Sequence, residues 1–224
     1  MPRFRRLIVP GLAHHVTQRG VRRQTTFFDD HDYRAYLKLA VDLLNDRPIE
    51  VWAYCLMPNH VHAVVVPRQD DCLSQYFATL HQRYARRTNA RHEWAGHLWQ
   101  KRFHSVVMDE AHTISAMRYV EMNPVRAGLC GHPEEWPWSS SRGNLGIAND
   151  PLIDRTATEC VISDWANYLA LQEGADDLRR LRQQTDTGRP DGSDKFIDLI
   201  ESRTGRRVRK RRAGRKRQSN MQSP

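Results

Sequence analysis

The chain has 224 residues, enough to bury one main core with appendages, and its formal net charge is +9. No apolar run approaches the ~20 residues of a membrane span, and the apolar stretch near the N-terminus is too short for a signal peptide. The four cysteines show no C-x-x-C spacing, which indicates reduced thiols in a cytosolic protein rather than a disulfide framework or a zinc ribbon.

The positive charge is concentrated near the C-terminus. Residues 203–217 carry ten Lys and Arg residues and no acid, so the rest of the chain has a net charge of −1. We therefore predict a disordered polybasic tail over 203–224 that binds nucleic-acid phosphates. A solvated tail without a partner and a tail on an anionic membrane surface are the less favoured alternatives.

The hydrophobic pattern predicts alternating strands and helices along the first two thirds of the chain. In chain order these are strand Leu12–Arg19, helix Asp29–Asp46, strands Ile49–Met57 and His60–Val66, helix Cys72–Arg91, strand Gln100–Met108 and helix Asp109–Ala127. The short Pro58-Asn59 link makes the second and third strands antiparallel neighbours. Pro124 should perturb the last turn of the final helix. This order matches an α/β (α+β) ferredoxin-like sandwich, an antiparallel sheet with helices on one face.

The remaining sequence predicts appendages to this main domain. We expect the main domain to span 1–145, a helical extension to span 146–202 and the polybasic tail to follow. The extension should contain short helices at Ile162–Glu173 and Asp194–Arg203. The stretch PEEWPWSSSRGNLG, rich in Trp, Pro and Ser, is typical of an ordered loop that packs back on the core.

The most informative pattern is the pair His60 and His62 in the run LMPNHVHAVVVP. Side chains alternate faces along a strand, so both imidazoles point to one side and Val61 points to the other. Two adjacent imidazoles can hold one divalent metal ion, whereas a closed structural site usually takes four ligands. The pair therefore predicts an open metal site, completed by other protein groups, water or a substrate phosphate. Two polar residues on a solvated strand face are the alternative.

Tyr119 and Asn123 lie four residues apart in the last predicted helix and so share a face. A tyrosine phenol, with a usual pKa near ~10, becomes a useful nucleophile when a metal-polarised phosphodiester lies in line with it. Asn123 can add an amide oxygen to a metal, and such oxygen-rich coordination suits Mg²⁺ or Mn²⁺. An ordinary core tyrosine is the alternative. Glu121 lies off this face, and we expect it to be solvated or paired with Arg118 or Arg126.

Several segments of the chain, taken in order, form a family pattern: HHVTQRG with FFDD, VWAYCLMPNHVHAVVVP, LWQKRFHSVVMDE, and RYVEMNPVRAGL with EEWPWSS. In these segments the chain resembles the REP-associated tyrosine transposases, which belong to the HUH single-strand DNA transposase superfamily and have an IS200-like domain. The resemblance implies that His60 and His62 are the metal-binding pair, Tyr119 the single nucleophile and Asn123 the helix-borne ligand. It also implies cleavage of single-stranded DNA at REP-type hairpins, with a 5′-phosphotyrosine intermediate and a free 3′-OH.

Basic and polar residues near the strands predict a DNA-binding surface, because arginine offers paired donors to exposed base edges and to phosphates. The candidates are Arg3, Arg5, Arg6, Gln18, Arg19, Arg22, Arg23, Lys101 and Arg102. We expect Arg83, Arg86 and Arg87 on a solvated helix face. His14 and His15 face opposite ways on the first strand, so one of them can approach the metal site, although a structural role is favoured for both.

The sequence thus predicts a metal-dependent endonuclease and strand transferase for hairpin single-stranded DNA, acting in the bacterial cytoplasm beside the nucleoid. Mg²⁺ or Mn²⁺ is the expected cofactor. We expect no membrane partner and a monomer, since the acidic segment 151–202 can cover a dimerisation surface. The alternatives are a DNA-binding regulator that does not cleave, an HUH replication initiator or relaxase, and a zinc hydrolase.

Overall fold

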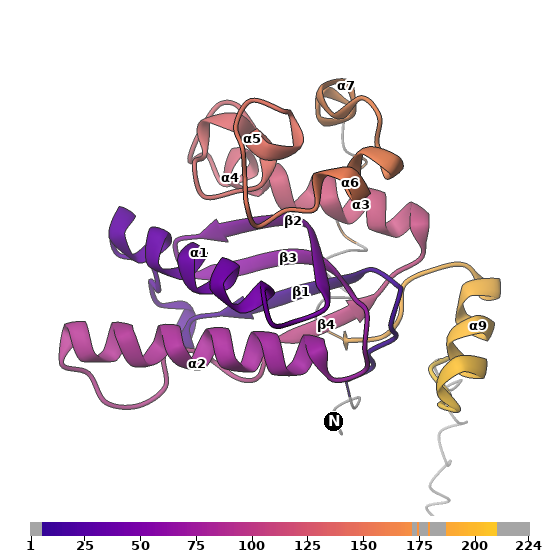
Figure 1. Ribbon diagram of the computed structural model, residues 1–224, viewed down its shortest axis with the longest axis horizontal. Helices are drawn as coiled ribbons and strands as arrows, with labels where there is room; N and C mark the ends of the chain where they lie inside the picture. The colour runs from indigo at the N-terminus through magenta and orange to yellow at the C-terminus, as the bar shows by residue number, and fades with distance from the viewer. Residues whose placement is uncertain (1–5, 172–173, 175–178, 180–186, 210–224) are drawn as a thin grey trace, which may run out of the picture.

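A four-stranded antiparallel sheet forms the centre of this computed structural model, which describes residues 6–171, 174, 179 and 187–209 (Figure 1). The sheet has the spatial order β2-β3-β1-β4. Its strands are β1 (His14–Arg19), β2 (Ile49–Met57), β3 (His60–Pro67) and β4 (His104–Val107). This order, with one helix before β2 and one before β4, confirms the predicted ferredoxin-like α+β fold class.

The strand predicted over 100–108 is shorter than expected. Its first residues form a loop that lies along the end of β1 instead of a full strand. Gly20 pairs with Trp99 in an isolated bridge, and the Gln100 backbone N–H donates to the Arg19 carbonyl at 2.9 Å. This loop therefore borders the end of the sheet at which β1 finishes and β3 begins.

Helices α1 (Asp30–Leu44) and α2 (Cys72–His92) cover one face of the sheet (Figure 1). The sheet residues packed in this layer are Val16, Ile49, Val51, Tyr54, Leu56, Val61, Ala63 and Val65. The buried Asp32 carboxylate joins the two helices, because its Oδ1 accepts hydrogen bonds from Arg87 at 2.9 Å and Arg91 at 2.8 Å. The expectation that Arg87 lies on a solvated face is therefore wrong: it pairs with a buried acid.

Helix α3 (Glu110–Glu121) packs on the opposite face of the sheet, mainly against β2 and β3. The strand residues beneath it are Ala53, Cys55, Met57, Val64 and Val66. Both faces of these strands are thus buried, and a strand buried on both faces reads as a near-continuous apolar run rather than an alternating one. The expectation that helices lie on one face holds for α1 and α2 and is wrong for α3.

The helix predicted over 109–127 is divided in two. Helix α3 ends at Glu121 and a short helix, α4 (Asn123–Arg126), follows after Met122. Pro124 has no backbone N–H to donate to the carbonyl four residues earlier, so the hydrogen-bond ladder of α3 cannot continue through it. The break comes at Met122, three residues after Tyr119.

The segment after α4 returns to α3 and packs on it. It contains the short helices η2 (Pro133–Glu135), α5 (Ser141–Asn144), α6 (Arg155–Val161) and α7 (Trp165–Ala170). Trp165 and Leu169 of α7 join the core that lies under α3. The helix predicted at Ile162–Glu173 begins later than expected because Asp164 caps it, accepting from the Asn167 backbone N–H at 3.0 Å.

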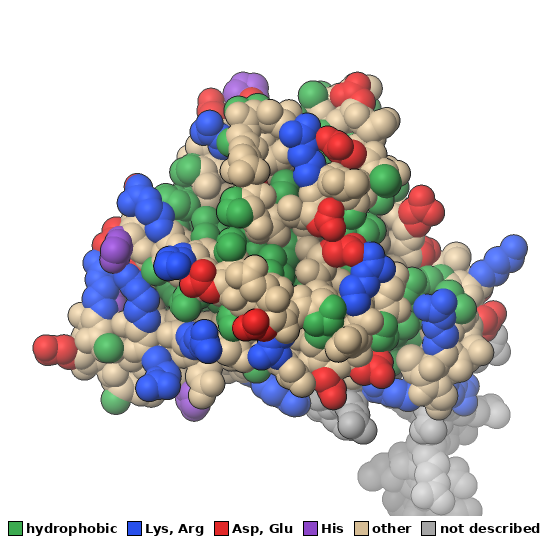
Figure 2. Space-filling view, in the orientation of Figure 1, with side chains coloured by type: hydrophobic (Ala, Val, Ile, Leu, Met, Phe, Trp, Pro, Cys, Tyr) green, Lys and Arg blue, Asp and Glu red, His purple; other side chains and the backbone are tan. Residues whose placement is uncertain are grey.

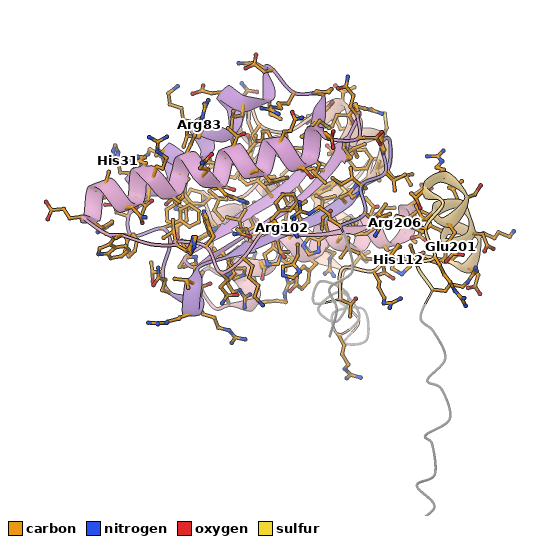
Figure 3. The ribbon with its side chains drawn as sticks, turned by 90° about the horizontal axis from the view of Figure 1, so that it is seen from below. His31, Arg83, Arg102, His112, Glu201 and Arg206 are labelled. Atoms are coloured by element: carbon orange, nitrogen blue, oxygen red, sulfur yellow. The ribbon has the colours of Figure 1, made fainter. Side chains whose placement is uncertain are left out.

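Helix α9 (Asp194–Thr204) packs beside β4, at the edge of the sheet (Figure 1). The side chains of this cluster are Leu7, Val9, Val107, Phe196, Ile200 and Val208. His112 joins the first turn of α3 to the same region, with Nδ1 2.5 Å from an Asp109 oxygen and Nε2 3.2 Å from an Asp191 oxygen (Figure 3). Helix α9 ends within the predicted tail, at Thr204, and Val208 is buried in this cluster. The beginning of the predicted tail, residues 203–209, is therefore packed on the fold.

The rest of the tail, residues 210–224, lies outside the described residues. The predicted division into segments 1–145, 146–202 and 203–224 stays a prediction. In the part of the chain that the structure describes, no helix combines the length and apolar character that crossing a membrane requires.

Candidate active site

The histidine pair lies on the face of the sheet that α3 covers. His60 and His62 project side by side from β3, with their ring centroids 4.9 Å apart. The strand register sets His60 between Met57 and Arg19, and His62 between Cys55 and Thr17. The alternation predicted from the His-x-His spacing is therefore the arrangement that the sheet adopts.

Each of these imidazoles uses its Nδ1 in a hydrogen bond. His60 Nδ1 lies 2.6 Å from Asn59 Oδ1, and His62 Nδ1 lies 2.9 Å from Nε2 of His15. Neither Nε2 atom is hydrogen-bonded to another described residue, so both are available to a ligand. Burial, with the nearby positive charge of Arg19, lowers the pKa of His60 to about 3, and burial lowers the pKa of His62 well below its usual value. Both rings are thus neutral at neutral pH, the form that binds metals.

Tyr119 lies on α3 directly beside the histidines. Its ring meets His62 edge to face, with centroids 5.7 Å apart, and meets His15 in the same way at 6.1 Å. The Tyr119 residue is 8 % exposed. The fold therefore brings the predicted nucleophile and one of the predicted metal ligands into contact, although 57 residues of sequence separate them.

Asn123 begins α4, one residue after the end of α3. Its Nδ2 atom is buried and has no hydrogen-bond partner among the described residues. The premise that Tyr119 and Asn123 share one continuous helix is wrong, because Met122 separates the two helices. The unpartnered atom is a hydrogen-bond donor, which fits an oxygen atom of a ligand such as a phosphate, whereas a metal ion would take the Oδ1 of the same amide.

Arg126 is a residue of this site that the sequence pattern did not identify. Its guanidinium carbon lies 4.2 Å from the centroid of the Tyr119 ring, and one of its amino groups donates to the Tyr119 backbone carbonyl. A cation over an aromatic face is attracted by the ring quadrupole. Arg126 therefore holds the Tyr119 ring from α4, on the far side of the helix break. The expected pairing of Glu121 with Arg126 is not what the structure shows.

A cavity of about 420 Å³ opens beside the histidine pair. Its lining residues are Thr17, Gln18, Arg19, Arg23, His60, His62, Gln100, Lys101, Arg102 and His104. Four of these side chains are cationic and none is acidic, so the cavity favours phosphate groups. Tyr119 is not among the lining residues. In contrast, the α1–α2 face shows basic and acidic side chains interspersed, as expected of a solvated surface (Figure 2).

The predicted DNA-binding residues divide into groups. Arg19, Arg23, Lys101 and Arg102 line the cavity, and Figure 3 labels Arg102 in the view from below. Gln18 also lines it, but its side chain donates to the Lys101 carbonyl at 2.8 Å and so supports the wall. Arg22 is exposed in the turn Val21–Arg23, where its positive φ of 53° places it in the left-handed region.

Of the N-terminal arginines in the predicted DNA-binding set, Arg6 is the one that the structure describes, and it does not line the cavity beside the histidines. Arg6 is engaged within the protein: it donates to the Phe103 carbonyl at 2.7 Å, and its guanidinium lies 3.5 Å from the centroid of the Phe103 ring. Arg6 lines a second cavity of about 530 Å³, between α2 and the loop before β4. Arg3 and Arg5 lie outside the described residues.

Glu121 is fully buried, so the expectation that it is solvated or salt-bridged is wrong. Its carboxylate accepts hydrogen bonds from Ser140 Oγ at 2.6 Å, Asn144 Nδ2 at 2.7 Å and Trp165 Nε1 at 2.6 Å. Burial raises its pKa to about 7, partly offset by these three donors. The C-terminal extension is thereby fastened to the helix that carries Tyr119. A signal was present in the sequence, since the Trp- and Ser-rich stretch is rich in hydrogen-bond donors.

Comparison with known proteins identifies the family. The model of the IS200-like transposases matches residues 9–123, just over half of the chain. The chain belongs to the IS200-like transposase family. The matched region of this transposase contains His60, His62 and Tyr119 and ends at Asn123.

Individual relatives of this transposase agree with that assignment. The REP-associated tyrosine transposase of Escherichia coli strain K12 is 22 % identical over 170 residues, which cover 73 % of this chain and 100 % of the relative. A relative from Haemophilus influenzae is 27 % identical over 105 residues, 42 % of this chain and 59 % of the relative. The resemblance seen in the sequence, and the enzyme class it implied, are confirmed.

A solved structure shows the same fold. It is that of a REP-associated tyrosine transposase bound to a REP hairpin, and it matches with a TM-score of 0.56 and 21 % identity. The match covers 65 % of this chain and 86 % of the other. At this level of identity the likeness supports the architecture of the transposase, and the roles of individual residues rest on the geometry described above.

Proposed function

We propose that this transposase is a metal-dependent nickase and strand transferase that cleaves REP-like hairpins of single-stranded DNA. The observation that carries the proposal is the contact between Tyr119 and His62, beside His60 and a cavity lined by four cations. A tyrosine nucleophile next to an open histidine pair is the arrangement required for transfer of a phosphodiester to a phenol. The REP hairpin in the similar structure supports the substrate class.

His60, His62 and Asn123 would hold the divalent metal ion. Two neutral imidazoles with available Nε2 atoms fit an open site of this kind, and the side-chain oxygen of Asn123 would be the third ligand. No cluster of three or more His, Cys, Asp or Glu side chains suited to a metal occurs among the described residues, which disfavours a closed zinc site. A bound Mg²⁺ or Mn²⁺ supplies Lewis-acid polarisation of the scissile phosphate.

The residues of the chain perform the remaining steps. Arg19, Arg23, Lys101 and Arg102 bind the phosphates that flank the scissile bond. The Tyr119 phenol oxygen attacks phosphorus, a new P–O bond forms, and the bond from phosphorus to the 3′-oxygen breaks. The phenolic proton passes to solvent, and the departing oxygen takes a proton to become a 3′-OH. The 3′-OH of a second DNA end then attacks the phosphotyrosine, which restores the phenol.

The test is a search for the covalent intermediate. Full-length protein is incubated with a labelled REP-like hairpin strand and Mn²⁺, and the products are separated under denaturing conditions. We expect a protein–DNA adduct and a free 3′-OH fragment, both absent when EDTA is added. Binding of the hairpin without any adduct, in Mn²⁺ or Mg²⁺, would favour a regulator that does not cleave.

Substitution His62→Ala should weaken Mn²⁺ binding by more than ~100-fold, because it removes one of two imidazole ligands. Binding is measured on the full chain by titration, with free Mn²⁺ followed by electron paramagnetic resonance. The matched control is His104→Ala, which removes a histidine that lines the same cavity from β4. Equal losses in the two variants would contradict the assignment of His62 as a ligand.

Substitution Arg102→Ala should weaken hairpin binding at low salt and reduce the slope of log K against log salt by about 1, the value expected for one lost phosphate contact. The measurement is a fluorescence anisotropy titration at several salt concentrations. Arg34→Ala is the control, because Arg34 is ion-paired with Asp30 on the α1 surface. An unchanged slope for Arg102→Ala would remove Arg102 from the DNA-binding surface.

A further inference from the structure

We propose that His15 is a positioning residue of the metal site, which fixes the His62 ring so that His62 Nε2 offers its lone pair to the metal. The inference rests on the metal-dependent function proposed above and adds a residue to it. It follows from the contact between the two rings and from the hydrogen bonds that their neighbours make. No metal-ligand role is assigned to His15 itself.

The contact between His15 and His62 is close and buried. His15 projects from β1, the strand next to β3, on the face that α3 covers, since it pairs with Val64 while Thr17 pairs with His62. Its Nε2 lies 2.9 Å from His62 Nδ1, and the two rings stack with centroids 5.1 Å apart at an angle of 15°. His15 also touches the edge of the Tyr119 ring. His15 therefore contacts both a proposed metal ligand, His62, and the proposed nucleophile, Tyr119.

A neutral imidazole carries one N–H and one lone pair, so this hydrogen bond has two possible directions. If His62 Nδ1–H donates to His15, the lone pair of His62 lies on Nε2, where it can bind a metal. If His15 donates instead, Nε2 of His62 carries the proton and is blocked. A partner on Nδ1 that accepts a hydrogen bond is the usual device that selects the tautomer of a metal-binding histidine.

The neighbouring histidine, His60, supports the first of these directions by analogy. His60 Nδ1 lies 2.6 Å from Asn59 Oδ1, and the Asn59 amide is oriented by its Nδ2, which donates to the Arg23 carbonyl at 3.0 Å. An amide oxygen can only accept, so His60 must carry its proton on Nδ1 and its lone pair on Nε2. With His15 accepting from His62, both ligands present the same nitrogen to one metal ion.

His14, the other member of the doublet, has a different role. It points to the opposite face of the sheet, and backbone groups satisfy both of its ring nitrogens. Nε2 accepts from the Val9 N–H at 3.2 Å, and Nδ1–H donates to the Leu12 carbonyl at 2.8 Å. His14 is as deeply buried as His15, which makes it a matched control on the same strand.

The first experiment measures Mn²⁺ affinity of full-length protein, without DNA and independently of cleavage. We expect His15→Leu to raise the dissociation constant by about 10- to 100-fold, because it removes the acceptor of the His62 Nδ1–H. His15→Gln should recover most of the affinity, since its side-chain oxygen can accept in place of Nε2. His14→Gln should leave the affinity unchanged. A purely structural role would not produce this rescue by an acceptor.

The second measurement reads the tautomer directly by ¹⁵N NMR of histidine-labelled wild-type protein without metal. We expect the His62 resonances of a protonated Nδ1 and an unprotonated Nε2, assigned by comparison with His62→Ala. A proton on Nε2 overturns the proposal, and this result does not depend on whether His15→Leu folds. Wild-type Mn²⁺ affinity in folded His15→Leu, with loss in His62→Ala, overturns the role of His15 alone. Wild-type affinity in His62→Ala overturns the metal site as well.

Discussion

Replacing Tyr119 by Phe should abolish the covalent protein–DNA adduct and lower cleavage of the hairpin strand by at least ~10³-fold. The variant lacks the phenol oxygen of the proposed nucleophile, while its ring can keep the contacts with His62 and the Arg126 guanidinium. Hairpin affinity should therefore be retained. Single-turnover cleavage and adduct formation under denaturing conditions measure the first effect, and anisotropy measures the second.

The matched control is Tyr168→Phe. Tyr168 lies on α7, and its hydroxyl donates to the Ile114 carbonyl of the same helix α3 at 2.8 Å. Loss of this hydroxyl removes one hydrogen bond to α3 but no group of the site, so adduct formation should persist. Adduct formation by Tyr119→Phe at the wild-type level would show that another residue is the nucleophile.

Replacing Glu121 by Gln should remove a pH dependence of stability. Relative to this variant, the wild-type protein should lose about 3 kcal/mol of unfolding free energy between pH 4.5 and pH 8. The size follows from the rise in the Glu121 pKa from 4.5 to about 7, at ~1.4 kcal/mol per unit. Urea unfolding of both proteins at several pH values gives the difference.

The sign follows from proton binding. Because burial raises the pKa of Glu121, the folded protein holds this proton over a range in which the unfolded chain has released it, so folding binds a proton. The stabilisation is complete below about pH 4.5 and is lost as the pH rises through about 7. The buried histidines add their own pH dependence, but the comparison with Glu121→Gln cancels it.

A second substitution tests the same carboxylate by removing one of its hydrogen-bond donors. Trp165→Phe removes the indole N–H that donates to Glu121 at 2.6 Å and helps to stabilise its charged form. The pKa of Glu121 should rise further, so the pH dependence should extend to higher pH rather than disappear. An unchanged pH profile in both variants would contradict the ionisation of Glu121 as its source.

Local patterns were sufficient for most of the sheet. The bounds of β2 agree with the prediction, and β3 differs by one residue, because β-branched and aromatic runs next to a two-residue turn are strong strand signals. The last strand has a weaker sequence pattern, and its predicted bounds are less accurate. The last strand was overestimated because the residues around Gln100 satisfy their backbone by pairing with the end of β1, a contact that no local pattern reveals.

Two side chains show why the charge of a residue did not predict its burial or its partners. Glu121 and Arg6 are both of types that usually face water. The carboxylate of Glu121 is satisfied in the interior by three donors from later parts of the chain, and Arg6 is held by the carbonyl and ring of Phe103. These partners lie 19 to 97 residues away along the chain, so only the folded structure brings them together.

By itself the sequence determined that His60 and His62 share one face of a strand, because the two-residue repeat of a strand is a local property. Through the family resemblance it also identified Tyr119 as the residue to examine. The tertiary structure decided that α3 covers the face opposite to α1 and α2, and so that Tyr119 meets His62. Both faces of β2 and β3 are apolar, and an apolar pattern on both sides cannot tell which helix covers which side. The roles inferred for His15 and Arg126 depend on that docking, because each is defined by a contact between separate elements of the fold.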